Sequence, residues 1–347
     1  MKNTAITAAI LLFLSLYSCN TQTNNTPKSP NTIVDFTIAF GSCNKQYKPN
    51  ILWKEVKKNN PDLWIWGGDN IYSDTDEKSK MAQDYETLKN QQGYLELVGN
   101  LPVMATWDDH DYGFNDSGIE FHKKEQAQKL FLDFFNVAQN SPRRKQVGIY
   151  KAKEFKTKEG SIKVLVLDTR YFRTALIKAS KGTKKRYVAN MDENSSILGT
   201  AQWNWLENEL KTSTADFNII VSSIQILSSE HGFETWGNFP DEVKKLKNSI
   251  TKSKAKGVFM VSGDRHISEF SKTMISNLQY PLIDFTSSGL THSYAAFVSE
   301  PNKYRVQNVI SEISFGLLQF NFNNKSVTMQ MRGINNKIVQ ELNQIYP

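Results

Sequence analysis

The segment Trp107-Asp108-Asp109-His110-Asp111 holds the densest set of chemically reactive side chains in the sequence. It follows an apolar run, residues 101–106, which predicts a buried strand, so the polar side chains emerge where that strand ends. Three carboxylates this close together repel one another unless cations neutralise them, and α/β sheets bind ligands at the carboxyl ends of their strands. The segment therefore indicates a cation-binding catalytic loop, with a solvated acidic loop as the alternative.

The same pattern, an apolar run that ends in polar residues, recurs four more times in the chain. The four further clusters are Gly41-Ser42-Cys43 after residues 36–40, Gly68-Asp69 with Tyr72 after 63–66, Asp168-Thr169-Arg170 after 162–167, and Ser262-Gly263-Asp264 with His266 after 257–261. Polar ends of several parallel strands meet at one edge of a sheet. The five clusters together predict a single site.

Each cluster by itself has an ordinary alternative. Cys43 could be a small buried hydrophobic residue, or a thiolate whose pKa a metal lowers. His266 could be a hydrogen-bonded histidine or a ligand beside Asp264. Arg170 could place its guanidinium on two phosphate oxygens, or form a structural pair with Asp168.

Residues outside these central positions could extend the site. Asn115 and Asp116 follow the Trp107 segment, and with Asp168 they could hold a further calcium ion. The run 286–292 could place hydroxyl groups and the His292 imidazole at the rim of the site. The loop 230–240 could close over the site or form a stabilising aromatic loop.

The elements that must position these residues alternate in type. Predicted strands at 36–40, 63–66 and 101–106 are separated by predicted helices at 53–59 and 85–98, which indicates a mainly parallel sheet. Further helices are expected at 123–135, 199–210 and 241–251, and further strands at 149–155, 162–167, 217–222, 257–261 and 282–285. The alternating segments 314–322, 326–332 and 337–342 are expected to be antiparallel and to extend a second sheet.

The N-terminus predicts export. Lys2 and the apolar run 5–16 form a signal-like segment that is shorter than the roughly 20 residues that span a bilayer. Residues 16–19 resemble the lipobox of bacterial lipoproteins, in which Cys19 would be lipidated; an ordinary signal peptide is the alternative. We expect a signal peptide at 1–18, a lipidated cysteine and flexible tether at 19–34, and one catalytic domain at 35–347. The protein would be lipid-anchored to a bacterial membrane, at the outer membrane or cell surface.

The charge pattern says little about a macromolecular partner. The formal net charge of +7 is spread over the chain, with clusters at residues 143–145, 181–186 and 244–247. Aromatic residues do not alternate with these basic residues as they do in nucleic-acid platforms, so no specific nucleic-acid partner is expected. A mildly positive field favours anionic substrates.

In their order and residue types, the five clusters resemble the alkaline phosphatase D (PhoD-like) family of metallophosphoesterases, over the chain from Phe36 onward. The resemblance implies an α/β four-layer sandwich of two mixed β-sheets flanked by helices. It also implies a metal centre of two or more ions at the strand ends and hydrolysis of phosphate esters. We expect a monomer.

Ligand chemistry divides the candidate metal residues into two sets. A thiolate, a phenolate, an imidazole and a carboxylate suit a trivalent transition metal, such as the iron(III) of the family, better than calcium. This first set is Cys43, Asp69, Tyr72 and His266. Oxygen ligands alone suit calcium or another hard divalent ion. This second set is Asp69, Asp109 and Asp264, with Asp69 as the bridge.

The resemblance implies phosphate mono- or diester hydrolysis through in-line attack by a metal-bound oxygen nucleophile. In this scheme Arg170 neutralises charge on the phosphoryl oxygens, and His110 protonates the leaving alkoxide. Asp108 and Asp111 would be orienting groups or outer ligands.

Two alternatives remain open from sequence. A phospholipid-directed phosphodiesterase would use the same site on a lipid substrate. A non-catalytic calcium-binding surface lipoprotein would need neither Cys43, Tyr72 nor His110, so their joint presence argues against it.

Overall fold

The computed structural model describes residues 33–347. The predicted signal peptide and the predicted lipidation of Cys19 lie outside the described residues, as does most of the predicted tether. Within the described part, no helix is long and apolar enough to cross a membrane.

The first sheet combines both ends of the described chain. Its parallel strands are β1 (Phe36–Gly41), β2 (Leu63–Gly67) and β3 (Val103–Thr106). The C-terminal strands β13 (Phe315–Asn321), β14 (Ser326–Arg332) and β15 (Ile338–Ile345) continue this sheet in antiparallel pairing. The strand order is β15-β14-β13-β1-β2-β3.

The prediction that the C-terminal strands extend the second sheet was therefore wrong. β13 pairs with β1, and Phe40 lies opposite Gly316 in the register. A Cβ atom on Gly316 would lie 2.1 Å from Cε1 of Phe40, so the glycine makes room for this ring. Alternation in sequence indicates a strand but does not select its partner, which depends on such side-chain fits.

The second sheet has the order β12-β10-β11-β9-β8-β5-β4. Its strands are β4 (Lys151–Lys156), β5 (Ser161–Val166), β8 (Phe217–Val221), β9 (Val258–Ser262), β10 (Ser268–Thr273), β11 (Leu282–Ser287) and β12 (Arg305–Ile310). The central four, β11, β9, β8 and β5, are parallel, and the outer strands are antiparallel, so the sheet is mixed. β10 and β12 were not predicted, because neither segment is a continuous apolar run.

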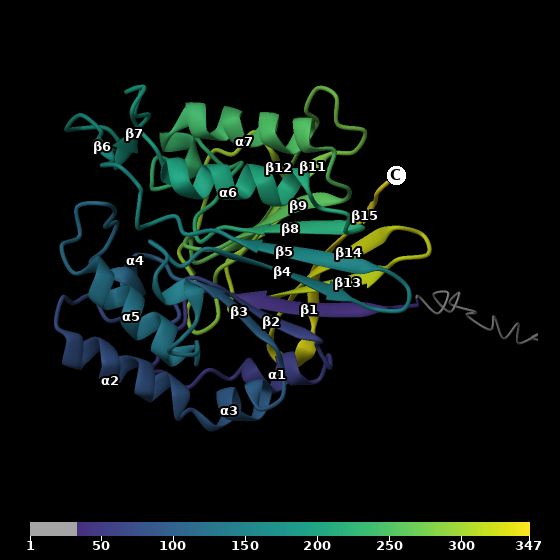
Figure 1. Cartoon of the computed structure of the whole chain (residues 1–347), viewed down its shortest axis with the longest axis horizontal. Coiled ribbons are helices and arrows are strands. Elements are labelled where there is room, and N and C mark those ends of the chain that lie inside the picture. The colour runs from purple at the N-terminus through teal and green to yellow at the C-terminus, as the bar shows by residue number, and fades with distance from the viewer. Residues whose placement is uncertain (1–32) are drawn as a thin grey trace, which may run out of the picture. The chain divides into compact units, whose positions relative to one another are not determined.

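Helices cover the outer faces of the two sheets, which gives four layers (Figure 1). α1 (Trp53–Lys57), α2 (Lys78–Lys89), α3 (Gln92–Val98) and α5 (Lys124–Phe134) cover the first sheet. α6 (Gly199–Lys211) and α7 (Pro240–Ser253) cover the second. Between the sheets lies an apolar core with aromatic contacts from both, such as Phe40 with Phe285 at 4.8 Å between ring centroids.

The predicted helix at 85–98 is two helices, α2 and α3. The chain breaks at Gln91, which has an extended backbone conformation (φ −66°, ψ 117°). The side chain of Gln91 accepts a hydrogen bond from Trp53 Nε1 (3.1 Å) and donates one to the backbone oxygen of Gln46 (2.7 Å). These long-range contacts fix the break, and sequence periodicity does not report them.

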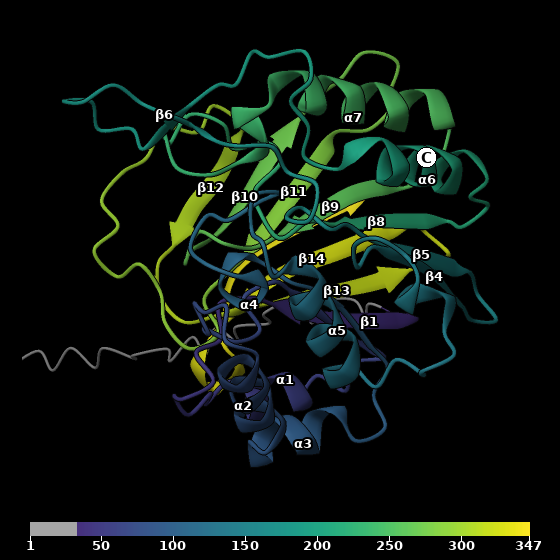
Figure 2. The same ribbon diagram turned by 60° about the vertical axis from the view of Figure 1, so that its left-hand side comes forward.

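Two short elements lie at the ends of the strands. The Trp107 segment continues into the short helix α4 (Asp109–Tyr112). A separate two-stranded hairpin, β6 (Ile177–Lys178) and β7 (Tyr187–Val188), pairs with neither large sheet and projects from the body of the fold (Figure 2).

Candidate metal centre

The loops that follow β1, β2 and β9 bring the predicted first set of metal ligands together. The Cys43 thiol donates to Asp69 Oδ2 (3.4 Å), and the Tyr72 hydroxyl donates to the same oxygen (3.0 Å). Tyr72 Oη also lies 2.9 Å from His266 Nε2. One ligand atom from each of Cys43, Asp69 and His266 lies within 4.8 Å of the others.

A second group shares Asp69 with the first. Ligand atoms of Asp69, Asp109 and His110 lie within 4.8 Å of one another. Asp109 accepts hydrogen bonds from the backbone nitrogens of His110 (3.0 Å) and Asp116 (2.6 Å). Asp69 is thus the residue shared by the two candidate ligand groups.

Asp264 lies beside these groups. Cys43 Sγ contacts the backbone oxygen of Asp264 at 3.6 Å. Burial raises the pKa of Asp264 well above its usual range, and the nearby carboxylates of Asp109 and Asp69 raise it further. Among the described residues the Asp264 carboxylate joins no group of ligand atoms within 4.8 Å of one another, and His110 takes the place predicted for Asp264 beside Asp69 and Asp109.

The backbone at the site adopts conformations that L residues seldom take. Four candidate ligands have positive φ: Cys43 (62°), Asp69 (51°), Asp264 (72°) and His266 (54°). Left-handed conformations at non-glycine residues cost energy and collect at functional sites. The turns also pack against each other, because a Cβ atom on Gly263 would lie 2.6 Å from the backbone oxygen of Gly67.

The electrostatics of the site favour bound cations. Burial, together with Asp109, raises the pKa of Asp69 to about 7, and burial also raises the pKa of the Cys43 thiol. Asp69 Oδ1 and Asp108 Oδ2 are buried and have no hydrogen-bond partner among the described residues. Buried acceptors without partners are costly, so the donor set fits metal ions that would satisfy and neutralise it.

His110 belongs to the second group and also contacts Tyr72 of the first set. Its Nδ1 is 2.6 Å from Asp74 Oδ1, and its ring stacks on Tyr72 with 4.1 Å between centroids. Burial lowers the pKa of His110, but the carboxylates of Asp69, Asp109 and Asp74 outweigh it and raise the pKa to about 11. Asp74 was not predicted, although it follows Asp69 in the same loop.

The Arg170 side chain pairs with Asp108 and Glu234, and only the backbone nitrogen of Arg170 donates to Asp168. Its guanidinium is fully buried, donates from Nε to Asp108 Oδ1 (2.6 Å) and from Nη1 to Glu234 Oε2 (2.7 Å), and pairs with Asp108 through Nη2 as well. Arg173 also pairs with Glu234 (2.8 Å). In this structure the Arg170 guanidinium holds the carboxylate of Asp108, the neighbour of the candidate ligand Asp109.

Glu234 is the site residue that sequence reasoning missed most clearly. It is fully buried and lies with Asp109 and Asp116 in a third group of carboxylates within 4.8 Å. The loop that contains it is packed, since Trp236 is buried and donates to Ser222 Oγ (3.0 Å). The stabilising alternative for this loop therefore describes it better than a closing lid.

Asp168 and Asp111 are structural carboxylates. Asp168 accepts hydrogen bonds from Trp107 Nε1 and from the backbone nitrogens of Ile149, Arg170 and Tyr171. These four donors occupy the carboxylate, so the predicted role of Asp168 as a metal ligand was wrong. Asp111 accepts from the backbone nitrogen of Asp108 (2.6 Å) and from Asn70 Nδ2 (2.5 Å), which makes it an orienting group in the cap of α4.

The predicted further calcium site does not assemble from Asn115, Asp116 and Asp168. Asn115 is exposed, and Asp168 is occupied by its own donors. Asp116 groups with Asp109 and Glu234, and its Oδ2 also accepts from Arg186 Nη1 (2.8 Å) and Tyr187 Oη (2.6 Å).

His292 lies beside the first set, at the rim where it was predicted. Its ring centroid is 4.3 Å from that of His266 and 5.2 Å from that of Tyr72. Nδ1 lies 3.2 Å from Thr291 Oγ1, whereas the buried Nε2 has no hydrogen-bond partner among residues 33–347. The unpartnered Nε2 of His292 is therefore available to a molecule bound at the candidate metal centre.

Two mixed sheets between helical layers, with this site at their strand ends, define a metallophosphatase-type fold. The chain belongs to the PhoD-like phosphatase family, whose model matches residues 38–336. This membership confirms the predicted family and fold class.

Individual relatives agree with this assignment. The chain is 24% identical over 292 residues to alkaline phosphatase D of Bacillus subtilis (strain 168), and the match covers 71% of this chain but 48% of that protein, so the chain spans about half the length of the relative. A solved structure of PhoD covers 90% of this chain and 69% of its own, with a TM-score of 0.68 at 18% identity. A dimetal phosphatase from Danio rerio covers 91% of this chain and all of its own, with a TM-score of 0.55 at 13% identity. At these identities the two structures establish the fold alone.

Proposed function

We propose that the protein is a metal-dependent phosphoesterase that hydrolyses phosphate mono- or diesters. The observation that carries this proposal is the pair of candidate cation-ligand groups that share Asp69, one with Cys43 and His266 and the other with Asp109 and His110. The family assignment and the name of the Bacillus subtilis relative support the same reaction class.

The ligand sets suggest two different ions. Cys43, Tyr72, His266 and Asp69 would hold iron(III), and Asp69, Asp109 and Asp264 would hold calcium or another divalent ion. When bound, these ions would supply Lewis acidity at the phosphoryl group and a nucleophile at neutral pH.

The protein's own groups would orient the reaction. Glu234 holds Arg170, and Arg170 holds Asp108 and with it the start of α4, so that Asp109 faces Asp69. His110 would donate a proton to the leaving oxygen, and the carboxylate of Asp74 would fix the orientation of its ring. In this proposal Arg170 acts by holding Asp108 and not by contacting the substrate phosphate, because its guanidinium pairs with Asp108 and Glu234.

Metal removal tests the proposal directly. Exhaustive chelation should abolish hydrolysis of a nitrophenyl phosphate, and recovery should require both iron and calcium, because the two ligand sets differ in chemistry. Metal analysis of the purified protein measures which ions are bound. Activity that persists after complete metal removal would refute the proposal, and calcium without a transition metal would favour the calcium-binding lipoprotein.

The role of His110 predicts a dependence on the leaving group. His110→Ala should lower kcat about 100-fold on alkyl esters, whose leaving oxygen needs a proton, and less than about tenfold on nitrophenyl esters. Asp74→Asn should also lower kcat on both ester types, but by a smaller factor than His110→Ala, because the imidazole is still present and only its orientation is released. Equal losses on both ester types in His110→Ala would exclude His110 as the acid.

The substrate remains a choice between small phosphate esters and phospholipids. A phospholipid-directed phosphodiesterase is the second candidate, and the basic hairpin β6–β7 beside the site favours it. Comparing a phosphomonoester, a soluble phosphodiester and a phospholipid as substrates separates the two. Export, lipid anchoring through Cys19 and a monomeric state belong to the same proposal, and mass spectrometry of the mature N-terminus would test the lipidation.

A further inference from the structure

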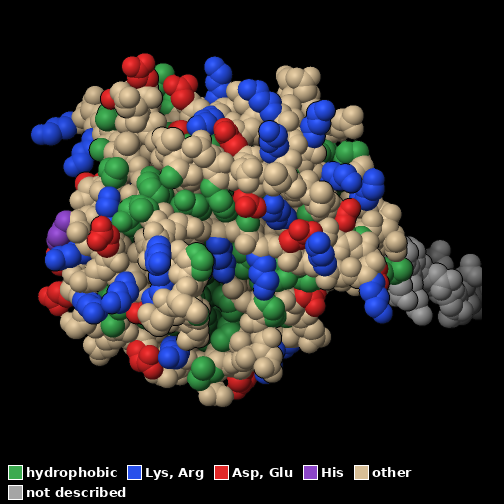
Figure 3. Space-filling model, viewed as in Figure 1, with side chains coloured by type: hydrophobic (Ala, Val, Ile, Leu, Met, Phe, Trp, Pro, Cys, Tyr) green, Lys and Arg blue, Asp and Glu red, His purple; other side chains and the backbone are tan. Residues whose placement is uncertain are grey.

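The β6–β7 hairpin concentrates positive charge on an exposed projection. Residues 177–188 contain no acid and five basic side chains, all exposed: Lys178, Lys181, Lys184, Lys185 and Arg186. The exposed acids Asp192 and Glu193 follow the hairpin. The four lysines form no ion pair with any residue in the described range 33–347. On the face seen in Figure 3, basic side chains are interspersed with acidic ones.

The same hairpin also exposes apolar side chains. Ile177 is 44% exposed and Val188 39%, and Met191, three residues after the end of β7, is 72% exposed. Exposed apolar residues among unpaired lysines are typical of surfaces that enter the interface of an anionic membrane, where both kinds of side chain gain energy. A soluble polyanion, in contrast to a membrane, would pair with the lysines but would leave the apolar side chains exposed to water.

The hairpin is attached to the metal centre. Arg186 and Tyr187 both donate to the Asp116 carboxylate, which lies within 4.8 Å of ligand atoms of Asp109 and Glu234. The backbone nitrogens of Arg186 and Tyr187 donate to the Gly232 oxygen (2.8 and 2.9 Å), which ties the hairpin to the loop of Glu234. Figures 1 and 2 both show β6 projecting past the ends of α6 and α7.

We propose that the β6–β7 hairpin docks on an anionic phospholipid surface and so brings lipid phosphates to the edge of the metal centre. The binding step stands independently of catalysis. Only its consequence, the supply of lipid substrate, rests on the proposed function.

The test is binding to vesicles of equimolar phosphatidylcholine and phosphatidylglycerol, measured by cosedimentation. The protein carries Cys19→Ser so that no acyl chain contributes. The triple variant Lys181→Gln/Lys184→Gln/Lys185→Gln should bind about 100-fold more weakly, because each basic side chain near an anionic membrane contributes about fivefold. Binding should also weaken with salt, and be far lower on pure phosphatidylcholine. The unfolding midpoint should stay unchanged, since these lysines are exposed and unpaired.

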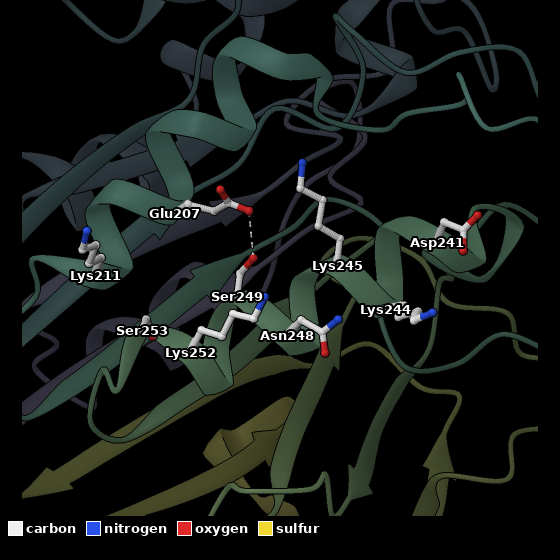
Figure 4. Close-up of a pocket in the computed structure, with 9 residues that line it drawn as sticks. All are labelled: Glu207, Lys211, Asp241, Lys244, Lys245, Asn248, Ser249, Lys252 and Ser253. Atoms are coloured by element: carbon white, nitrogen blue, oxygen red, sulfur yellow. Dashed lines mark hydrogen bonds between the residues drawn. The ribbon is translucent and has the colours of Figure 1, made fainter.

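A matched control comes from the groove of about 470 Å³ between α6 and α7 (Figure 4). Lys211, Lys244 and Lys252 line it, and the variant Lys211→Gln/Lys244→Gln/Lys252→Gln removes the same three charges from another face. This control should keep vesicle binding within about threefold, so that net charge alone is excluded as the cause.

Three results would overturn the proposal. The first is unchanged vesicle binding in the hairpin variant, and the second is an equal loss of vesicle binding in the control variant. The third is a hairpin variant that loses binding to soluble polyphosphate but keeps its binding to vesicles. Hairpin-dependent vesicle binding by a protein that hydrolyses no phosphate ester would leave the docking intact and refute the proposed function instead.

Discussion

Asp69→Asn is expected to lower kcat/KM by roughly 1,000-fold or more and to remove both metal ions, because metal ions supply several kcal/mol of transition-state stabilisation. Asp69 is the residue common to both ligand groups. Its Oδ2 accepts from Cys43 and Tyr72, while its Oδ1 has no partner within the described chain. An amide in its place loses the negative charge that both cations need. Metal analysis of the purified variant, together with kinetics on a nitrophenyl ester, measures the effect.

The unfolding of metal-free protein gives a second readout for this variant. In the folded protein the pKa of Asp69 is raised to about 7. The contribution of this carboxyl group to the free energy of unfolding is therefore largest below the pKa of the unfolded chain, and it is lost as the pH rises through about 7. Asparagine does not ionise, so metal-free Asp69→Asn should unfold at a higher temperature than the metal-free wild type at about pH 8. Metal addition should then raise the Tm of the wild type and leave that of the variant unchanged.

Asp168→Asn is the matched control. Asp168 is also a fully buried aspartate at a strand end, but its carboxylate is occupied by four hydrogen-bond donors. The asparagine side chain has an NH₂ group in place of one carboxylate oxygen, and this group cannot accept the hydrogen bonds offered there. The variant should therefore be less stable by about 1 to 3 kcal/mol. Both metals should stay bound. An Asp69→Asn protein that keeps both metals and its activity would contradict the bridging role.

The sequence carried enough information to find the strands that hold the site. Apolar runs that end in polar residues mark strand ends, and β1, β2, β3, β5 and β9 each begin and end close to the predicted positions. Cys43, Asp69 and Tyr72 follow the neighbouring strands β1 and β2 of the first sheet, and His266 follows β9 of the second. Their positions at strand ends could be predicted, whereas their convergence also requires the two sheets to pack together.

What the sequence could not show depends on long-range packing. Glu234 is a single acid in an irregular loop, and only the fold brings it against Arg170 and Arg173. Asp74 is a loop aspartate whose role becomes visible only in the fold, where His110 stacks on Tyr72 and its Nδ1 then lies beside the Asp74 carboxylate. Arg170 has the right type for a phosphate ligand, but whether a guanidinium faces substrate or protein is decided by which acids surround it.

The buried ion pairs of Arg170 make it the second large effect. Arg170→Met should destabilise the protein by about 3 to 5 kcal/mol, because removing one partner leaves a buried charge without compensation on Asp108. Denaturant unfolding measures this change. Lys57→Met is the comparison, since Lys57 pairs with Glu96 on the surface at 3.5 Å, with side chains 56% and 49% exposed, and should change stability by less than about 1 kcal/mol.

A double-mutant cycle distinguishes a positioning role for Arg170 from a substrate clamp. In an Asp108→Asn background, the decrease in the free energy of unfolding caused by Arg170→Met should be smaller by more than about 1 kcal/mol. The reason is that the Asp108 charge, which Arg170 compensates, is already absent. Metal affinity should fall in Arg170→Met, since Asp108 precedes the ligand Asp109 and its carboxylate is held by Arg170 and Ser223. If Arg170→Met instead unfolds like the wild type and raises KM for phosphate esters at full metal occupancy, the guanidinium must leave its buried carboxylates to bind substrate. The positioning role would then be wrong.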